Sequence, residues 1–292
     1  MQANQHSHYV GRFAPSPTGP LHFGSAVAAI ASFLDARANH GKWLLRIDDL
    51  DPPREQPGAS DSIITCLKAL GLEWDEEIVY QSQRDRLYEY ALETLRKADH
   101  LFDCACSRRE VGPGPYPGTC RSGLPAGKTA RSVRFRTNNE QISFTDTIFG
   151  PQLEDLRETV GDFILRRSDG LHAYHLAVVV DDAAQQVTHV VRGVDLLPST
   201  SRQIALQDAL GYPRPRYLHF PVVCDASGVK LSKQTGASGI NIEEVTDIWA
   251  RALRFLGQPD VTTNRNLRLD EIISLATQNW RIDPLRTKAQ LP

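Results

Sequence analysis

Strand-like apolar runs and longer helical runs alternate along the first hundred residues of the chain. Residues 9–13 and 43–47 are short apolar runs, as expected for buried strands of a parallel sheet. Between them lies a helical run of small residues, 25–39, which stops at Gly41. Strand, helix and strand in this order predict the start of a parallel α/β sheet.

The alternation continues to about residue 98. Ser60 is placed to cap a helix whose apolar residues share one face and which ends at Gly71. A strand near 78–80 and a helix from 84 to 98 follow. These elements complete the first half of the predicted sheet.

The pattern breaks between residues 101 and 170. This stretch is rich in Gly and Pro and has only short β-like pieces, 132–137 and 142–148, which predicts an insertion. The alternation resumes in four later segments, 172–182, 187–193, 199–210 and 217–223. Two further helices are expected near 242–257 and 270–279.

We therefore predict an α/β protein with a Rossmann-type doubly wound parallel sheet. Its halves are residues 1–100 and 171–240, separated by an α/β insertion at 101–170 and followed by a short helical region at 241–292. No apolar run approaches the ~20 residues of a membrane span, and the polar N-terminus does not resemble a secretory signal. We expect a cytoplasmic monomer without membrane contact.

The formal net charge of −2 hides two basic segments. Residues 96–136 hold nine Lys and Arg against three Asp and Glu, and residues 251–292 hold seven against four. Such concentrations fit contact with the phosphate backbone of RNA. An unevenly charged, solvated surface is the alternative.

Three of the five cysteines lie close together in the chain: Cys104, Cys106 and Cys120. In a reducing compartment such a cluster indicates metal ligands rather than disulfides, with reduced, unligated thiols as the alternative. Zinc prefers four ligands, and the residues alone leave water or a histidine such as His100 as the fourth. Cys66 and Cys224 are interpreted as core thiols.

The turn from Arg12 to Ser25, RFAPSPTGPLHFGS, follows a strand and enters a helix. Unpaired backbone N–H groups and the positive end of the helix dipole bind phosphate at such a helix end. His22 is placed to donate to phosphate oxygens, and Gly24 lets a nucleotide approach the backbone. Helix capping and packing are the plainer explanation of this His and Gly pair.

A second candidate phosphate site is KLSKQ, from Lys230 to Gln234, in a Gly-bounded loop after a predicted strand. Lys230 and Lys233 suit a lid that neutralises a triphosphate as charge builds on the leaving pyrophosphate. Seen alone, this segment is equally a solvated basic loop.

Together, HFG and KLSKQ resemble the two signatures of class I aminoacyl-tRNA synthetases. Four longer strings resemble the glutamate branch of that class and cover roughly residues 9–240: RFAPSPTGPLHFG, RIDDLDPPR, AYHLAVVVDD and VVRGVDLL. The resemblance implies an ATP-dependent ligase that activates L-glutamate, with Mg²⁺ on the ATP phosphates.

The resemblance also implies roles for individual residues, with His22 and Lys233 as the catalytic pair. The implied glutamate-binding residues are Arg12, Phe13, Ala14, Pro15, Ser16, Asp48, Tyr174 and Arg192. The implied ATP-binding residues are His22, Gly24, Lys230 and Lys233. Arginine suits the substrate carboxylates through its fork of donors, and Asp48 matches the acid that faces the substrate ammonium.

The cysteine pattern C-x-C…Y-x-x-x-C resembles the zinc site of shortened glutamyl enzymes that act on queuosine. This resemblance adds Tyr116 to the three cysteines as the fourth zinc ligand. Such a zinc ion is expected to be structural, because it holds a Gly- and Pro-rich basic loop in place.

Five positions depart from the usual pattern of the branch. Ser25 replaces the second histidine of the ATP motif, and Leu231 and Gln234 replace methionine and serine in the lysine loop. Asp48 is one methylene shorter than the usual glutamate. Val178 stands where full-length enzymes tend to have asparagine, which predicts weaker glutamate affinity.

The segment after the lysine loop is short in this sequence, whereas conventional glutamyl-tRNA synthetases continue there into an anticodon-binding region. This difference indicates which RNA the protein acts on. We expect a shortened member that activates glutamate without tRNA and transfers it to queuosine in the anticodon loop of tRNA(Asp). A truncated glutamyl-tRNA synthetase core that charges a tRNA 3′ end is the nearest alternative. The glutamate-pocket residues argue against a nucleotidyltransferase with another acyl substrate, and the ATP motifs argue against a non-catalytic RNA-binding paralogue.

Overall fold

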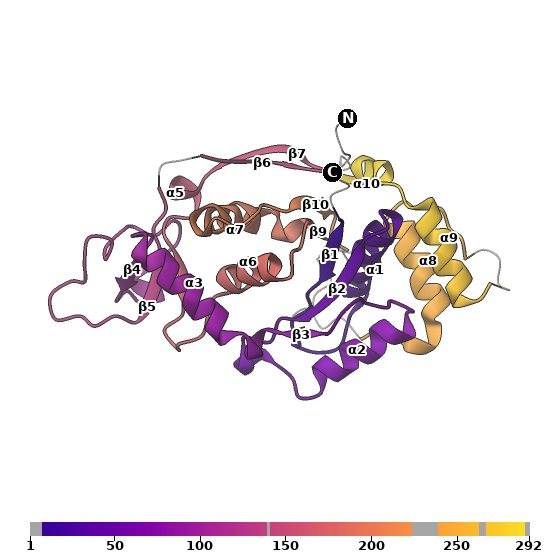
Figure 1. The fold of residues 1–292 in the computed structure, drawn as a ribbon, viewed down its shortest axis with the longest axis horizontal. Coiled ribbons are helices and arrows are strands. Elements are labelled where there is room, and N and C mark those ends of the chain that lie inside the picture. The colour runs from indigo at the N-terminus through magenta and orange to yellow at the C-terminus, as the bar shows by residue number, and fades with distance from the viewer. Residues whose placement is uncertain (1–7, 139–140, 224–238, 263–266, 290–292) are drawn as a thin grey trace.

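The computed structural model of the chain describes residues 8–138, 141–223, 239–262 and 267–289. Parallel strands occupy the middle of an elongated molecule, with an antiparallel sheet toward one end and the C-terminal helices toward the other (Figure 1). The chain therefore has a mixed α/β fold with a parallel sheet, as predicted.

The N-terminal part of the chain forms the first half of the parallel layer. Its strands pair in parallel in the order β1 (Val10–Phe13), β2 (Lys42–Ile47) and β3 (Val79–Tyr80). Its helices are α1 (Phe23–Ala38), α2 (Ala59–Ala69) and α3 (Asp85–Lys97). The order of strands and helices is the one predicted.

The second half consists of α6 (Tyr174–Ala184), β9 (His189–Gly193), α7 (Leu197–Leu210) and β10 (Arg216–Phe220). Strands β9 and β10 pair in parallel along their whole length. β9 lies beside β1, where the Thr188 backbone N–H donates to Val10 O at 2.9 Å. The strand ends of both halves therefore meet at one edge.

Residues between the two halves form two separate β structures. An antiparallel sheet contains β4 (Leu101–Cys104), β5 (Ser132–Phe135) and β8 (Phe163–Arg166). A hairpin of β6 (Gln141–Asp146) and β7 (Gly150–Asp155) pairs instead with β10, with Asp146 opposite Tyr217. Short helices α4 (Arg108–Val111) and α5 (Leu156–Thr159) complete this region. The four-part domain division stays a prediction, since the hairpin shares a sheet with the second half.

Two C-terminal helices, α8 (Val245–Phe255) and α9 (Leu269–Asn279), pack against α1. Trp249 of α8 is fully buried, and its Nε1 donates to Leu70 O at 3.1 Å. A further helix, α10 (Asp283–Ala289), was not predicted. Single 3-10 turns occur at Pro52–Arg54, Gln81–Gln83, Val194–Leu196 and Ile242–Glu244.

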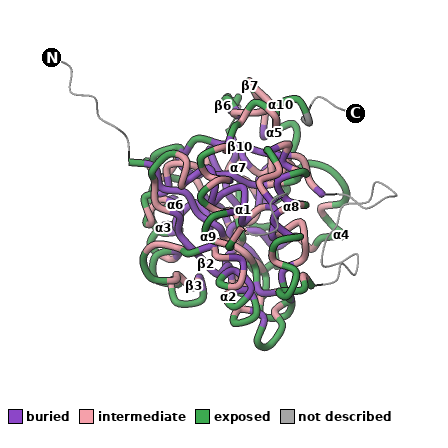
Figure 2. Tube along the Cα trace, turned by 90° about the vertical axis from the view of Figure 1, so that its right-hand side faces the viewer, coloured by how far each residue is buried: buried purple, intermediate pink, exposed green. Residues whose placement is uncertain are grey.

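Strand β2 is buried on both faces, which explains its continuous apolar sequence. Trp43, Leu45 and Ile47 belong to the core under α1 and α8, whereas Leu44 belongs to a second cluster with Ile204 of α7. The buried residues run through the centre of the molecule (Figure 2).

The prediction that Ser60 caps α2 is wrong. The helix begins at Ala59, and Gly58 is its N-cap residue, with a φ of 76° and no side-chain cap. Glycine tolerates this left-handed conformation, so the chain enters the helix before Ser60 is reached. Within the residues that the structure describes, no helix is both long and apolar enough to cross a membrane.

Candidate active site

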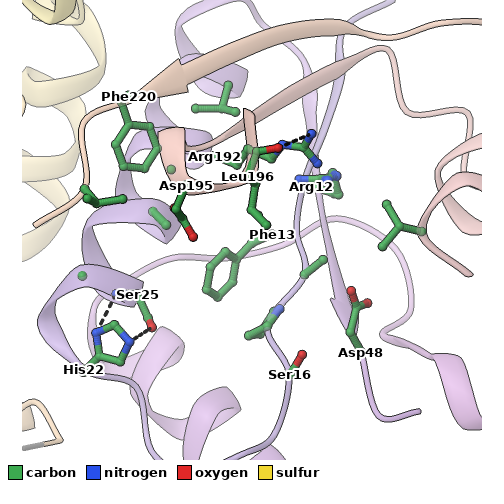
Figure 3. Close-up of a pocket in the computed structure, with 18 of the residues that line it drawn as sticks. Arg12, Phe13, Ser16, His22, Ser25, Asp48, Arg192, Asp195, Leu196 and Phe220 are labelled. Atoms are coloured by element: carbon green, nitrogen blue, oxygen red, sulfur yellow. Dashed lines mark hydrogen bonds between the residues drawn. The ribbon is translucent and has the colours of Figure 1, made fainter. Parts of the chain in front are cut away.

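A cavity of about 310 Å³ opens at the carboxyl ends of β1, β2 and β9 (Figure 3). Parallel sheets bind their ligands at this edge. All eight predicted glutamate-binding residues line it: Arg12, Phe13, Ala14, Pro15, Ser16, Asp48, Tyr174 and Arg192. His22 and Gly24 line the same space, so the predicted amino-acid and ATP residues meet in one cavity.

The Pro-rich turn after β1 is tied to the loop after β2 by backbone hydrogen bonds. The Asp48 N–H donates to Pro15 O at 3.0 Å, and the Gln56 N–H donates to Pro17 O at 3.0 Å. Proline has no N–H of its own, but its carbonyl remains available for such bonds. These bonds hold Ser16 beside Asp48 on the cavity wall.

His22 is the N-cap residue of α1 and also lines the cavity. Its Nδ1 accepts the Ser25 backbone N–H at 3.3 Å, and its Nε2 lies 3.0 Å from Ser25 Oγ. Because Nδ1 accepts, the imidazole carries its proton on Nε2. Capping therefore accounts for the orientation of the His22 ring.

A buried ion network lies behind the cavity wall. Arg46, which is fully buried, donates to Asp48 at 2.8 Å and to Asp182 at 2.7 Å. Asp182 also lies 3.3 Å from Arg12 Nε. Burial alone would raise the pKa of Asp182, but Arg12 and Arg46 hold it below its ordinary value. The charge of Arg12 is thus matched by a carboxylate within the protein.

Asp48 is the acidic group of the cavity with the strongest burial effect. Its side chain is buried, and this burial raises the pKa of Asp48 to about 6 although Arg46 opposes the shift. A nearby cation favours the ionised form of such a carboxyl group. Asp48 is therefore suited to face a substrate ammonium.

Arg192 at the end of β9 has a different environment from Arg12. Its Nε donates to His219 Nε2 at 2.9 Å, and its Nη2 donates to Thr200 Oγ1 at 2.9 Å. Its buried Nη1 has no hydrogen-bond partner among the described residues. Burial lowers the pKa of Arg192. Both side-chain partners are uncharged, so this cation is available to an anionic ligand.

Several cavity residues were not predicted from the sequence. They are Thr18, Ser25, Ala28, Val191, Gly193, Asp195, Leu196, Phe220, Val222 and Val223. Asp195 follows β9 within the string VVRGVDLL, so its place after a buried strand was a usable signal. Val178, which the sequence analysis treats as a replacement in the amino-acid pocket, lies in the cavity wall. Lys230, Leu231, Lys233, Gln234 and Cys224 lie outside the described residues.

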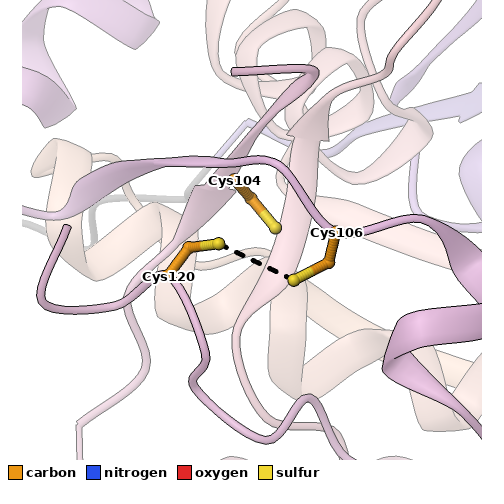
Figure 4. A group of neighbouring side chains, drawn as sticks. All are labelled: Cys104, Cys106 and Cys120. Carbon is orange, nitrogen blue, oxygen red and sulfur yellow. Dashed lines mark hydrogen bonds between the residues drawn. The ribbon is translucent and has the colours of Figure 1, made fainter. Parts of the chain in front are cut away.

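The predicted cysteine cluster exists in the structure. The sulfurs of Cys104, Cys106 and Cys120 point toward one another (Figure 4), and those of Cys106 and Cys120 are 3.6 Å apart. Tyr116 Oη lies 3.4 Å from the Cys104 sulfur and 3.6 Å from the Cys106 sulfur. Among the described His, Cys, Asp and Glu residues, no fourth one joins this group, so His100 is not part of it.

These distances fit a tetrahedral zinc ion. With Zn–S bonds of about 2.3 Å and a Zn–O bond of about 2.0 Å, sulfurs lie about 3.8 Å apart and sulfur to oxygen about 3.5 Å. Arg134 adds a cation, with its Nε 3.2 Å from the Cys104 sulfur and its guanidinium 3.9 Å from the Tyr116 ring centre. Burial would raise the pKa of Cys104, but hydrogen bonds from Tyr116 and Arg134 lower it to about 7. Cys66 is a buried free thiol, as predicted.

Comparison with known proteins identifies the family. Residues 9–112 and 121–259 match the class I tRNA synthetases for E and Q, in their catalytic domain. The glutamyl-Q tRNA(Asp) synthetase of Aromatoleum aromaticum is 51% identical, over 97% of this chain and 93% of that protein. The glutamyl-Q tRNA(Asp) synthetase of Dechloromonas aromatica is 49% identical, over 95% of both chains. The chain belongs to the glutamyl-Q tRNA(Asp) synthetase family.

Solved structures agree with this membership in the glutamyl-Q tRNA(Asp) synthetase family. The glutamate–tRNA synthetase of Elizabethkingia anophelis superposes with a TM-score of 0.80 at 25% identity, over 95% of this chain and 66% of that one. The glutamate–tRNA ligase of Elizabethkingia meningosepticum, solved in complex with its amino acid, gives a TM-score of 0.79 at 25% identity. The chain thus spans just under two thirds of each of these synthetases.

Proposed function

We propose that this chain activates L-glutamate with ATP and transfers the glutamyl group to queuosine in the anticodon loop of tRNA(Asp). One observation carries the proposal. A single cavity contains a buried acid, Asp48, an arginine without a carboxylate partner among the described residues, Arg192, and the N-terminus of α1 with His22. Asp48 suits the ammonium group of glutamate, Arg192 suits a carboxylate of glutamate, and the start of α1 with His22 suits a phosphate of ATP. The names of the relatives supply the acceptor RNA.

In the first step, the glutamate α-carboxylate oxygen attacks the α-phosphorus of ATP, and pyrophosphate leaves. Arg12, Tyr174 and Arg192 bind the substrate carboxylates, and Asp48 binds the ammonium. His22 and the N-terminal N–H groups of α1 stabilise the charge on the phosphate, with Lys230 and Lys233 on the leaving group. Mg²⁺ carried by ATP neutralises further phosphate charge.

In the second step, a hydroxyl of the queuosine cyclopentenediol attacks the glutamyl carbonyl carbon. An ester bond forms, AMP leaves and the hydroxyl proton is lost to solvent. The basic segments 96–136 and 251–292 bind the RNA backbone through their excess of Lys and Arg. We place this reaction in the cytoplasm, with its tRNA substrate.

We also propose a structural zinc ion bound by Cys104, Cys106, Cys120 and Tyr116. The side-chain distances above support four ligands at tetrahedral spacing. When bound, zinc supplies a fixed cross-link between β4 and the loop that follows it. The arginine beside Cys104 offsets part of the negative charge of the ligands.

The deciding experiment compares acceptors. The protein is incubated with labelled glutamate, ATP and tRNA(Asp) that lacks its terminal CCA, either with or without queuosine. Label is expected only on the queuosine-containing RNA, and nuclease digestion is expected to place it in the anticodon loop. Glutamate-dependent exchange of pyrophosphate into ATP is expected without any tRNA.

Two controls distinguish the proposed function from that of a synthetase core that charges the 3′ end of tRNA. Intact, unmodified tRNA(Glu) is expected to stay unlabelled, and labelling at its 3′ end would instead support a synthetase core that charges tRNA. His22→Ala is expected to slow pyrophosphate exchange by about a hundredfold, because it removes a donor to transition-state charge.

A further inference from the structure

The orientation of Arg192 depends on a side chain that does not line the cavity. Arg192 is buried, and two of its three nitrogens are engaged by His219 and Thr200. Only Nη1 lacks a partner among the described residues. Since Arg192 lines the cavity and the other two residues do not, they hold the guanidinium from behind.

His219, which accepts a hydrogen bond from Arg192, is neutral. Asp146 Oδ2 lies 2.7 Å from His219 Nδ1, so Nδ1 carries the proton and Nε2 presents a lone pair to Arg192. Burial lowers the pKa of His219, in keeping with an uncharged ring. A carboxylate in place of this imidazole would neutralise Arg192 before any ligand arrived. A neutral acceptor orients the guanidinium and leaves its charge for the substrate.

Asp146 is itself held rigidly. Its Oδ1 accepts the backbone N–H groups of Ile148 and Phe149, both at 2.9 Å, in the turn between β6 and β7. Its Oδ2 also accepts the His219 backbone N–H at 3.2 Å. Asp146 and His219 are both almost fully buried. The contacts therefore run from the hairpin turn through Asp146 and His219 to Arg192.

We propose that His219, held by Asp146, is a positioning residue that presents Arg192 to a carboxylate of the substrate. The proposal rests on the function proposed above. It follows that loss of the His219 acceptor weakens glutamate binding. ATP binding stays unchanged, because among the cavity residues His219 holds only Arg192, which faces glutamate.

The test compares His219→Gln with His219→Asn. A glutamine oxygen reaches the position of Nε2 and can accept from Arg192, whereas asparagine reaches only the position of Nδ1 and Asp146. His219→Asn is expected to raise the KM for glutamate by about tenfold, the loss of one charge-assisted hydrogen bond, and to leave the KM for ATP unchanged. His219→Gln is expected to restore most of the glutamate affinity. His189→Gln is the matched control, since His189 contacts Tyr9 and Thr188 outside the cavity.

Glutamate affinity is measured by calorimetry beside pyrophosphate exchange, and folding by thermal melting. Equal losses in the Gln and Asn variants, or a parallel rise in the KM for ATP, would overturn the positioning role and leave the proposed function intact. A wild-type protein that binds no glutamate would overturn both. Glutamate binding and exchange without transfer to queuosine would contradict only the choice of acceptor.

Discussion

Asp48 shows how one buried residue can tune substrate binding. Its carboxyl group shares Arg46 with Asp182, and burial raises the pKa of Asp48 to about 6. A bound ammonium stabilises only the ionised form. With the proposed role of Asp48, glutamate binding is coupled to release of a proton from Asp48 when the pH is near or below this pKa.

We predict that glutamate affinity falls as the pH drops through about 6. Above that value Asp48 is ionised in the free protein, so affinity is constant; below it, each pH unit is expected to cost about tenfold. Calorimetry from about pH 5 to about pH 8 measures this. Asp48→Asn is expected to bind glutamate more weakly and to lose most of this pH dependence. A flat profile for the wild type would contradict the role of Asp48.

The cavity residues differ in how far the sequence reveals them. Arg12, Ser16 and Asp48 lie in the contiguous strings that carry the resemblance to glutamyl enzymes, at the ends of β1 and β2, so they could be predicted with their surroundings. His219 could not, because nothing in YLHFPVV marks its histidine as a partner of Arg192. That contact exists only because parallel pairing places His219 opposite Arg192 in the sheet.

At the scale of single elements, the loop between β4 and β5 has little apolar support. Its core is the small cluster of Phe102, Cys104, Ala105, Tyr116 and Cys120. So few buried side chains cannot offset the conformational entropy of a long, Gly- and Pro-rich loop. A metal ion at the cysteines would supply the missing stabilisation.

Replacing one of the proposed zinc ligands is expected to remove the metal and lower the melting temperature. Cys106→Ser is expected to purify with little zinc, because a neutral hydroxyl is a poor substitute for a thiolate ligand. Tyr116→Phe is expected to keep zinc but bind it about tenfold more weakly in chelator competition. Elemental analysis and thermal melting measure both effects. Cys66→Ala is the control, because it removes a buried thiol outside the cluster. Wild-type protein that contains no zinc would contradict the proposed zinc site.

The way the strands of the inserted region pair could not be predicted from the sequence. Residues 142–148 were recognised as β-like, but their partner β10 comes much later in the chain and only one residue pair aligns. The apolar pattern of an edge hairpin does not specify which sheet it joins. Strands β1 and β2 were predictable because both of their faces are buried, which makes their sequences mostly apolar.

For the whole molecule, Asp35 of α1 joins distant parts of the chain. Its Oδ2 accepts the Tyr9 hydroxyl at 2.5 Å, and its Oδ1 accepts Trp280 Nε1 at 2.9 Å. Asp35, Tyr9 and Trp280 are all buried. The Asp35 carboxylate thus links the segment before β1 and the segment after α9 to helix α1 by hydrogen bonds.

We predict that Asp35→Leu lowers the free energy of unfolding by about 2–4 kcal/mol, because two buried donors lose their acceptor. Asp35→Asn keeps one carbonyl oxygen and is expected to lose about half as much. Urea unfolding followed by tryptophan fluorescence measures both. Equal losses in the two variants would show that side-chain charge or shape, not the hydrogen bonds, is responsible.

The cap at His22 bears on the proposed binding of ATP at the start of α1. His22 Nδ1 accepts the Ser25 N–H, so this one donor in the first turn of α1 is engaged by the imidazole. A phosphate oxygen bound at this helix end would take over that N–H and displace the ring, whose Nε2–H could then turn to the phosphate. On the proposed function, ATP binding at this helix end would therefore exchange one acceptor of the Ser25 N–H for another.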